Sequence, residues 1–343
     1  MSSPVKQTTD RDRNRRPETR QKDSVASHDT LDLVTVGETM ATFICEDATE
    51  RFRVTTAGAE SNVAAGVARL GCRARWISRL GDDQLGHLVH DAIVGYGVDV
   101  HVDWDPVRLS AACVKEVGPQ GSRMRYYRKA SAASRLDLLD LGALAAASWV
   151  HVTGVTPALS PENRAVVDQL VAVRPRAGRL SVDINYRPVL WDDPATAASV
   201  LVPLARQADV IFIGEDEALA LLGSEEPSVV AAALLARPGQ ELVLKRGAGA
   251  ATLITVNDEV SEPAQQVAVV DLTGAGDAFA AGYIAASVWG WNSHGRLRLG
   301  HFMAARVIGV LGDVSPIVDP EELAQLAESI QQTAPHTTRN PRR

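Results

Sequence analysis

The sequence predicts an α/β protein in which helices flank a central, mostly parallel β-sheet and a second, small sheet covers a site. Apolar strand patterns alternate with helix patterns along most of the 343 residues. Several of these strands end in polar or glycine residues, and in an open α/β sheet such ends mark the edge where a ligand binds. A hairpin pattern at residues 110–128 breaks the alternation and supplies the small sheet.

The first third of the chain begins with an apolar strand that runs into Gly37 and Glu38, as expected of a buried parallel strand. The helix that follows carries apolar residues from Val63 to Leu70 and stops at Gly71. The expected elements here are strands at 31–36, 41–45 and 52–54, a helix at 57–70, a strand at 73–79 and a helix at 84–95.

The hairpin pattern consists of extended runs at 110–117 and 122–128 around a turn that contains Gly118, Pro119 and Gly121. A hairpin within a parallel α/β chain does not easily join the main sheet. We therefore expect it to pair with the strands near 41–54 and to form the small covering sheet.

The alternation then resumes. The expected elements are strands at 149–152, 180–183, 210–213, 241–244, 251–255 and 266–270, and helices at 161–173, 196–207, 215–222, 226–236, 295–310 and 320–331. The strands end at Thr153–Gly154, Asp183–Asn185, Gly214–Glu215 and Lys245–Gly247, which marks the expected site edge.

Composition and charge exclude some functions. The net charge of −7 gives no sign of a nucleic-acid or membrane-surface binder. The three cysteines lack metal-ligand or disulfide spacing, which favours reduced thiols in a cytoplasmic protein, and no segment is long and apolar enough to span a bilayer. Residues 1–30 and 335–343 are expected to be disordered tails of one domain at 31–334.

The chemistry centres on residues 271–277, which lead directly into a helix of small residues. Gly274 and Gly276 allow a tight loop, and the N–H groups of a helix start attract an anion such as a phosphate. Asp277 beside this cradle is a candidate base that accepts the proton of an attacking hydroxyl. A capped helix start without catalysis is the alternative.

These residues also carry a family resemblance. The segment Asp271–Tyr283 resembles the carboxy-terminal signature of the ribokinase, or phosphofructokinase-B, superfamily, and Gly58–Gly71 resembles its amino-terminal signature. Leu80–Asp83 with Gly86 resembles a further block, so that the likeness covers 31–332. The resemblance implies a three-layer αβα sandwich with a lid from about 41–56 and 108–129. It also implies ATP and Mg²⁺ as cofactors, and it leaves open whether a monovalent cation such as K⁺ is bound.

Three stretches, 125–134, 151–154 and 183–191, resemble the 2-keto-3-deoxygluconate kinase branch. The resemblance implies ATP-dependent phosphorylation of a primary hydroxyl of a sugar or sugar acid. Arg128 suits a substrate carboxylate, and one of Tyr126 and Tyr127 is expected to face the ligand. A fructokinase-like or 5-dehydro-2-deoxygluconate-like kinase and a non-catalytic sugar and nucleotide sensor are the alternatives.

Transferred residue by residue, the resemblance assigns Asp277 as base, with the amides of Gly274, Ala275 and Gly276 as anion hole. By the same resemblance, Asp183, Asn185 and Arg187 would lie where the phosphates and the sugar meet. Simpler interpretations are a surface charge for Arg128, a solvated loop for Lys245 and a strand-end turn near Asn185. The expected substrate residues are Gly58, Ala59, Asn62, Tyr126, Arg128, Asp183, Arg187 and Asp277; those for the nucleotide are Lys245, Gly247, Gly249, Thr273, Gly274 and Gly276; those for the metal are Glu217 and Asp271.

Two positions depart from the family pattern. Gly214 stands where the family usually has Asn, although Glu217 is retained, and Leu272 replaces a small or hydroxylated residue. The first departure suggests more reliance on water, Glu217 or Asp216 around Mg²⁺. The half-exposed lid strands would have free edges, and we expect these to pair in a homodimer.

Overall fold

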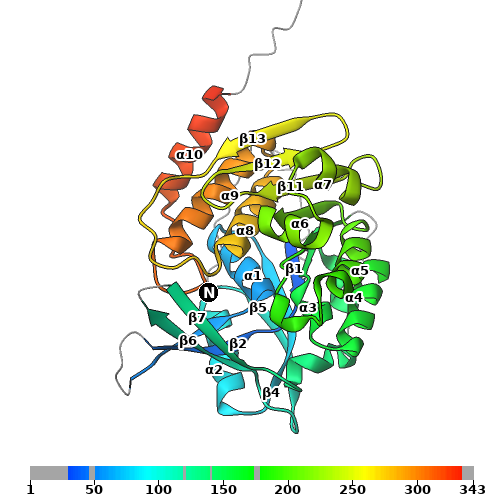
Figure 1. The fold of residues 1–343 in the computed structure, drawn as a ribbon. Helices are drawn as coiled ribbons and strands as arrows, with labels where there is room; N and C mark the ends of the chain where they lie inside the picture. The colour runs from blue at the N-terminus through cyan, green and yellow to red at the C-terminus, as the bar shows by residue number, and fades with distance from the viewer. Residues whose placement is uncertain (1–29, 46–50, 119–120, 140, 174–177, 334–343) are drawn as a thin grey trace, which may run out of the picture.

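The computed structural model describes residues 30–45, 51–118, 121–139, 141–173 and 178–333 (Figure 1). The two expected tails lie outside these ranges except for Thr30. None of the helices in this part of the chain is both long and apolar enough to cross a membrane.

The central layer is a nine-stranded sheet with the order β13-β12-β11-β10-β9-β8-β1-β4-β5. Neighbouring strands from β5 to β11 are parallel, whereas β12 and β13 pair antiparallel at one edge. The strands are β1 Leu33–Val36, β4 Ala74–Gly81, β5 Asp99–Asp105, β8 Trp149–Thr153, β9 Arg179–Asp183, β10 Val210–Gly214, β11 Glu241–Lys245, β12 Ala250–Ile254 and β13 Glu259–Pro263.

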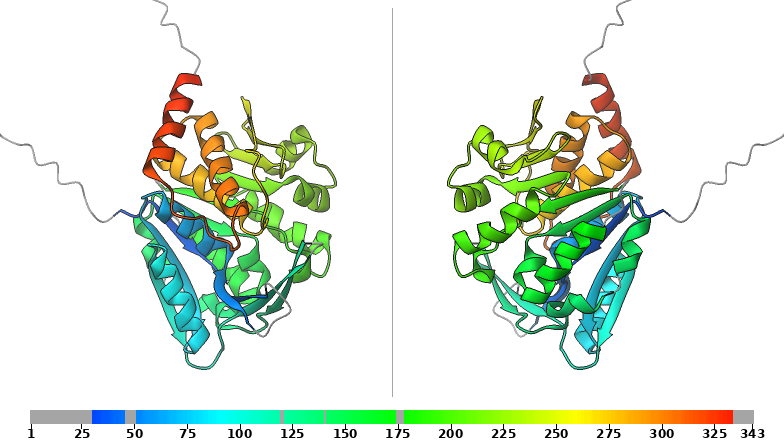
Figure 2. Two further views of the ribbon diagram at one scale, coloured as in Figure 1. Left: turned by 90° about the vertical axis from the view of Figure 1, so that its left-hand side faces the viewer. Right: turned by 90° about the vertical axis from the view of Figure 1, so that its right-hand side faces the viewer.

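Helices cover both faces of this sheet, and each face has its own apolar core (Figures 1 and 2). One face carries α1 Ala59–Arg69, α2 Gln84–Gly95, α8 Ala275–Val288, α9 Ser293–Ile308 and α10 Pro320–Thr333. The other side carries α3 Val155–Ala158, α4 Pro161–Val173, α5 Pro194–Ala205, α6 Glu215–Leu222 and α7 Pro227–Leu234. Short 3₁₀ helices lie at Ala132–Leu138, Leu141–Ala146 and Pro188–Leu190. The expected three-layer αβα sandwich is confirmed.

The second sheet has four strands in the order β3-β2-β6-β7 and corresponds to the segments expected to form a lid, so we call it the lid. Its strands are β2 Met40–Cys45, β3 Arg53–Ala57, β6 Ala112–Gly118 and β7 Gly121–Tyr127. The predicted hairpin is confirmed, because β6 and β7 pair antiparallel while β6 lies parallel to β2. Figure 1 shows this sheet to one side of the helical body.

The predicted strand at 266–270 is wrong. The strand that pairs with β12 is β13, which ends at Pro263, and 264–270 contain no strand. The Ala264 N–H still donates to the Gly249 carbonyl over 2.7 Å, after which the chain leaves β12. Val267, Val269 and Val270 are 41–58% exposed. Their apolar spacing therefore belongs to a surface segment. The edge strand β5 was not predicted.

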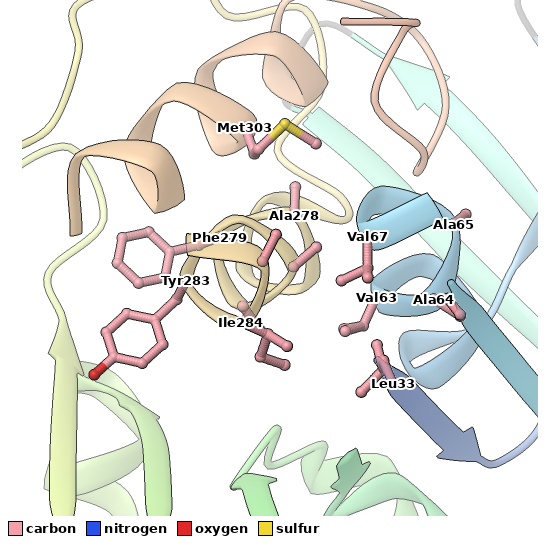
Figure 3. Packing of buried hydrophobic residues seen from close by; sticks show 14 of the residues in the cluster. Leu33, Val63, Ala64, Ala65, Val67, Ala278, Phe279, Tyr283, Ile284 and Met303 are labelled. Atoms are coloured by element: carbon pink, nitrogen blue, oxygen red, sulfur yellow. The ribbon is translucent and has the colours of Figure 1, made fainter. Parts of the chain in front are cut away.

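Close packing of α1 against α8 places the two signature segments side by side (Figure 3). A Cβ added at Gly66 of α1 would lie 2.6 Å from the Cβ of Ala281 in α8. Gly282 likewise lets α9 approach α8, because a Cβ there would lie 2.4 Å from the Leu299 carbonyl. Only small residues allow this approach. As a result, Asn62 in the first turn of α1 reaches Asp277 in the first turn of α8.

Candidate active site

Two cavities meet at Asp277. The larger, about 450 Å³, extends along the carboxyl ends of β9, β10 and β11 to α9. The smaller, about 90 Å³, lies between the start of α1 and the lid. The residues that line both cavities are Asn185, Arg187, Thr273, Gly274 and Asp277. The shared wall thus combines the loop that the sequence predicts to be catalytic with Asn185 and Arg187 from the segment after β9.

The Asp277 carboxylate is buried and is held by two amides. The Nδ2 of Asn62 donates to Oδ2 over 2.9 Å, and the Nδ2 of Asn185 donates to Oδ1 over 3.3 Å. Asn185 adopts a left-handed φ of 40°, which is uncommon for a residue with a side chain. Burial raises the pKa of Asp277 to about 7, although the Asn62 hydrogen bond opposes the shift and the nearby Asp183 charge adds to it. A carboxylate of this pKa suits a general base near neutral pH.

The loop before α8 has the geometry expected of an anion cradle. Gly274 has φ 81°, and a Cβ there would lie 2.5 Å from the Asp313 carbonyl, so that a side chain would be strained and would clash. Ala275 and Gly276 form the first turn of α8, where N–H groups lack the usual helical acceptor. Ala275 N donates to the Leu272 carbonyl over a long 3.4 Å.

Residues from the sheet edge line the larger cavity. The Lys245 ammonium donates to Asp183 over 2.7 Å and lies over the Phe212 ring. The pKa of Lys245 is raised: burial lowers it, but the Asp183 and Glu217 charges raise it more. Gly247 lines this cavity, whereas Gly249 is outside it in the turn between β11 and β12, where its N–H donates to Arg246.

Glu217 organises the backbone at the same edge. Its Oε2 accepts from the Gly214 N–H and its Oε1 from the Tyr186 N–H, both over 2.7 Å. Burial raises its pKa, and the Asp183 charge adds to this. A Cβ at Gly214 would lie 2.6 Å from an oxygen of Asp216. The Asp216 side chain thus occupies the space next to Gly214, the position where the family pattern has Asn.

The lid contributes Tyr126 and Arg128 to the smaller cavity, opposite Gly58, Ala59 and Asn62. The guanidinium of Arg128 lies 5.5 Å from the centre of the Tyr126 ring. Tyr127 points elsewhere: it is 64% exposed and does not line this cavity. Adjacent strand residues thus face opposite sides.

Arg128 is paired with Glu38, a residue that sequence reasoning did not assign to the site. Glu38 is 2% exposed, lines the smaller cavity and accepts a 3.1 Å hydrogen bond from the Ser131 hydroxyl. Burial raises its pKa, and the Arg128 charge opposes this shift. Its place directly after the β1 strand end was the available signal.

Asp271 lies behind the loop and lines neither cavity. Its carboxylate accepts from the buried ammonium of Lys115 on β6 and from the Thr273 N–H and hydroxyl. Burial alone would raise the pKa of Asp271. The hydrogen bonds from Lys115 and Thr273 outweigh burial, so that the pKa of Asp271 is lowered. Lys115 was also missed, although it occupies an inward position of the predicted lid strand, two residues after Cys113.

The sequence model that describes the pfkB family carbohydrate kinases matches residues 30–320 of this chain. The chain belongs to this family. It is 36% identical to a 2-dehydro-3-deoxygluconokinase of Bacillus subtilis (strain 168) over 309 residues, which cover 86% of this chain and 94% of that protein. It is 34% identical to a fructokinase of Klebsiella pneumoniae over 66% of this chain and 75% of that protein.

Solved structures agree on the fold of this carbohydrate kinase. The PfkB protein from Polaromonas sp. JS666 superposes with a TM-score of 0.75 at 32% identity, covering 82% of this chain and 97% of that one. Fructokinase from Vibrio cholerae O395, solved with fructose, ADP and calcium bound, superposes with a TM-score of 0.72 at 24% identity, covering 86% and 99%. At that identity the second likeness supports the fold alone.

Proposed function

We propose that this carbohydrate kinase transfers the terminal phosphoryl group of ATP to a primary hydroxyl of a sugar acid, with 2-keto-3-deoxygluconate (2-dehydro-3-deoxygluconate) as the best candidate. The observation that carries the proposal is the position of Asp277, a buried carboxylate with a pKa of about 7 where two cavities meet. The larger cavity has room for a nucleotide and the smaller for part of a sugar.

In this mechanism, Asp277 accepts the proton of the attacking hydroxyl as the phosphoryl group is transferred. The amides of Gly274, Ala275 and Gly276 stabilise the charge that develops on the transferred oxygens. Arg187, which lines both cavities, offsets phosphate charge. The lid excludes water from the transfer.

Unpaired polar atoms next to Asp277 support sugar binding in the smaller cavity. The Oδ1 atoms of Asn62 and Asn185 are buried and, within the described residues, have no hydrogen-bond partner. A buried acceptor without a donor is costly, and the hydroxyl groups of a sugar would supply donors. Gly58 and Ala59 border the same space through the start of α1.

The larger cavity suits ATP. Lys245 offers a cationic group at the wall, and Gly247, Thr273 and Gly276 line it through the two loops. Glu217 and Asp216 line this cavity and would hold a magnesium ion, which would offset the negative charge of the phosphates. The described residues contain no group of three or more acidic, His or Cys side chains able to hold a metal, and a phosphate-bound magnesium ion with several waters needs none.

The experiment that tests the proposal is a coupled ATP-consumption assay over a panel of sugars and sugar acids. We expect 2-keto-3-deoxygluconate to give the highest kcat/KM and its product to carry phosphate on the primary hydroxyl. Purified, folded protein that binds ATP tightly but phosphorylates none of the panel would instead support the sensor alternative.

One observation favours a neutral sugar as second candidate: Glu38 already neutralises Arg128 and would repel a substrate carboxylate. Arg128→Ala separates the candidates. For an acid substrate we expect KM to rise at least about tenfold, since a charge-assisted hydrogen bond contributes about 1.5–3 kcal/mol. For fructose, a fructokinase-like enzyme would show a small change. Equal losses on both would contradict a role in carboxylate recognition.

Two further predictions remain part of the proposal. Free edges at β3 and β7 of the lid favour pairing of two copies, which analytical ultracentrifugation would detect as a dimer. Cys45, Cys72 and Cys113 are not joined in disulfides, and a cytoplasmic enzyme stays our prediction.

A further inference from the structure

We infer that Lys115 is a built-in cation that braces the anion-hole loop from the lid and takes the place of a bound monovalent cation. This inference rests on the proposed kinase function, since it concerns the same loop. Lys115 is a positioning residue, because it lines neither cavity.

The surroundings of the Lys115 ammonium are those of an enclosed cation site. Its side chain is 0% exposed, and the two carboxylates beside it, Asp271 and Asp313, are 3% and 4% exposed. The ammonium donates to Asp271, donates to the Thr273 hydroxyl over 2.8 Å, and lies 3.6 Å from Asp313 Oδ1. Three side-chain oxygens near an ammonium match its three N–H donors in number.

These oxygens come from the two segments that fix the anion hole. Asp271 begins the loop and accepts from the Thr273 N–H over 3.2 Å and its hydroxyl over 2.9 Å. Asp313 belongs to the segment after α9, and its carbonyl lies against Gly274. A cation between Asp271 and Asp313 therefore fixes the start of the loop relative to the segment that packs against Gly274.

Charge balance shows why a cation is needed there. Two buried carboxylates that face one another repel, and an unpaired buried charge is strongly destabilising. Oxygen ligands of this kind suit a small cation as well as they suit an ammonium. A lysine tethered to the lid supplies the charge without recruiting an ion from solution.

The tether also couples the lid to the loop. Lys115 pairs with Met124 across the hairpin, and the next inward pair is Cys113 with Tyr126. Met124 and Tyr126 line the smaller cavity together with Asp313. The lid face that meets the substrate thus carries the cation that braces the catalytic loop.

The test compares the wild-type chain with Lys115→Met and, as a matched control, Lys129→Met, which removes an exposed lid lysine. Kinase activity and melting temperature are measured in potassium, ammonium, sodium or tetramethylammonium chloride at equal ionic strength. We expect wild type and Lys129→Met to be indifferent to the cation. Lys115→Met should lose about 10- to 100-fold in kcat in tetramethylammonium, as expected when the anion hole is misplaced.

Potassium or ammonium should restore most of the activity of Lys115→Met and raise its melting temperature by mass action, whereas tetramethylammonium is too large to enter. A wild-type enzyme that requires potassium overturns the inference without any variant, and so does a folded Lys115→Met that no small cation rescues. If no sugar is phosphorylated, the proposed function fails, but the cation-specific melting shift still decides whether Lys115 replaces an ion.

Discussion

The two cavities that meet at Asp277 are built in different ways. The larger one is walled by the sheet edge and by α8 and α9, all parts of the body. The smaller one takes part of its wall from the lid, which ion pairs hold to the body: Arg128 to Glu38, and Lys115 to Asp271 and Asp313. The larger cavity, which we propose binds the nucleotide, is therefore fixed mainly by the sheet and its helices, whereas the smaller cavity, proposed for the sugar, depends on contacts between residues 90 or more positions apart.

Because the two cavities are built differently, substitutions in one cavity should affect the kinetics of one substrate more than those of the other. A change in the body cavity should alter the KM for ATP, and a change on the lid should alter the KM for the sugar. Asp277 belongs to both cavities, so that its replacement should abolish the transfer itself while leaving both ligands bound.

The largest effect is expected for Asp277→Asn. Loss of the base should lower kcat by about 10²- to 10⁴-fold, with the affinities for ATP and sugar changed far less. Single-turnover kinetics measure the first and calorimetric titration the second. An undiminished rate would show that another group accepts the proton and would remove Asp277 from the mechanism.

Next comes Lys245→Met on the nucleotide side. It leaves the Asp183 carboxylate, 2% exposed, without its cation and removes a positive group from the cavity wall. We expect kcat/KM for ATP to fall by about 10- to 100-fold, since a lost charge-assisted hydrogen bond and an unpaired buried carboxylate act together. The KM for the sugar should change little. Arg128→Ala should show the reverse pattern, with a raised KM for the sugar and little change in the KM for ATP. Arg246→Met is the control, because Arg246 lines the same cavity but its 3.9 Å pair with Glu215 is partly exposed. An equal loss there would contradict a specific role of Lys245.

How much of this arrangement the sequence predicts depends on how far apart the partners lie. Gly274 and Asp277 lie within one short motif, so local pattern and family resemblance identify them together. Lys115 and Asp271 are 156 residues apart, and only the closure of the lid on the loop brings them together. Glu38 was missed for the same reason, since its partner Arg128 is 90 residues away along the chain.

The conformation of Asn185 was equally out of reach. A strand-end turn was the simpler interpretation of this residue, yet its positive φ directs the amide at Asp277. The false strand at 266–270 shows the opposite failure. There the local pattern was read as burial, although the chain had already left the sheet at Pro263.

A smaller effect is expected from pH. Because burial raises the pKa of Asp277 to about 7, the base is lost to protonation as the pH falls below that value. The kcat/KM of the wild-type enzyme should therefore fall about tenfold per pH unit below the pKa and level off above it. The same raised pKa stabilises the fold below the ordinary Asp range, and this contribution is lost as the pH rises through about 7. Asp277→Asn should show neither dependence, and an acid limb that persists in this variant would belong to another group.

The smallest effect is expected at Gly214, where the body cavity departs from the family pattern. Its φ of −81° is open to any residue, and the nearest atom to an added Cβ is a carboxylate oxygen of Asp216 at 2.6 Å, while Glu217 lies at an ordinary contact distance of 3.5 Å. Gly214→Asn should therefore fold normally and add one polar group beside the metal and phosphates, raising kcat/KM for ATP by up to about threefold, the worth of a weak hydrogen bond. Gly214→Ala, which displaces Asp216 without supplying an amide, should give no gain. A large loss in Gly214→Asn but not in Gly214→Ala would mean that this cavity uses the space beside Asp216 for the nucleotide or its metal, and that the body side is less rigid than the sheet pairing suggests.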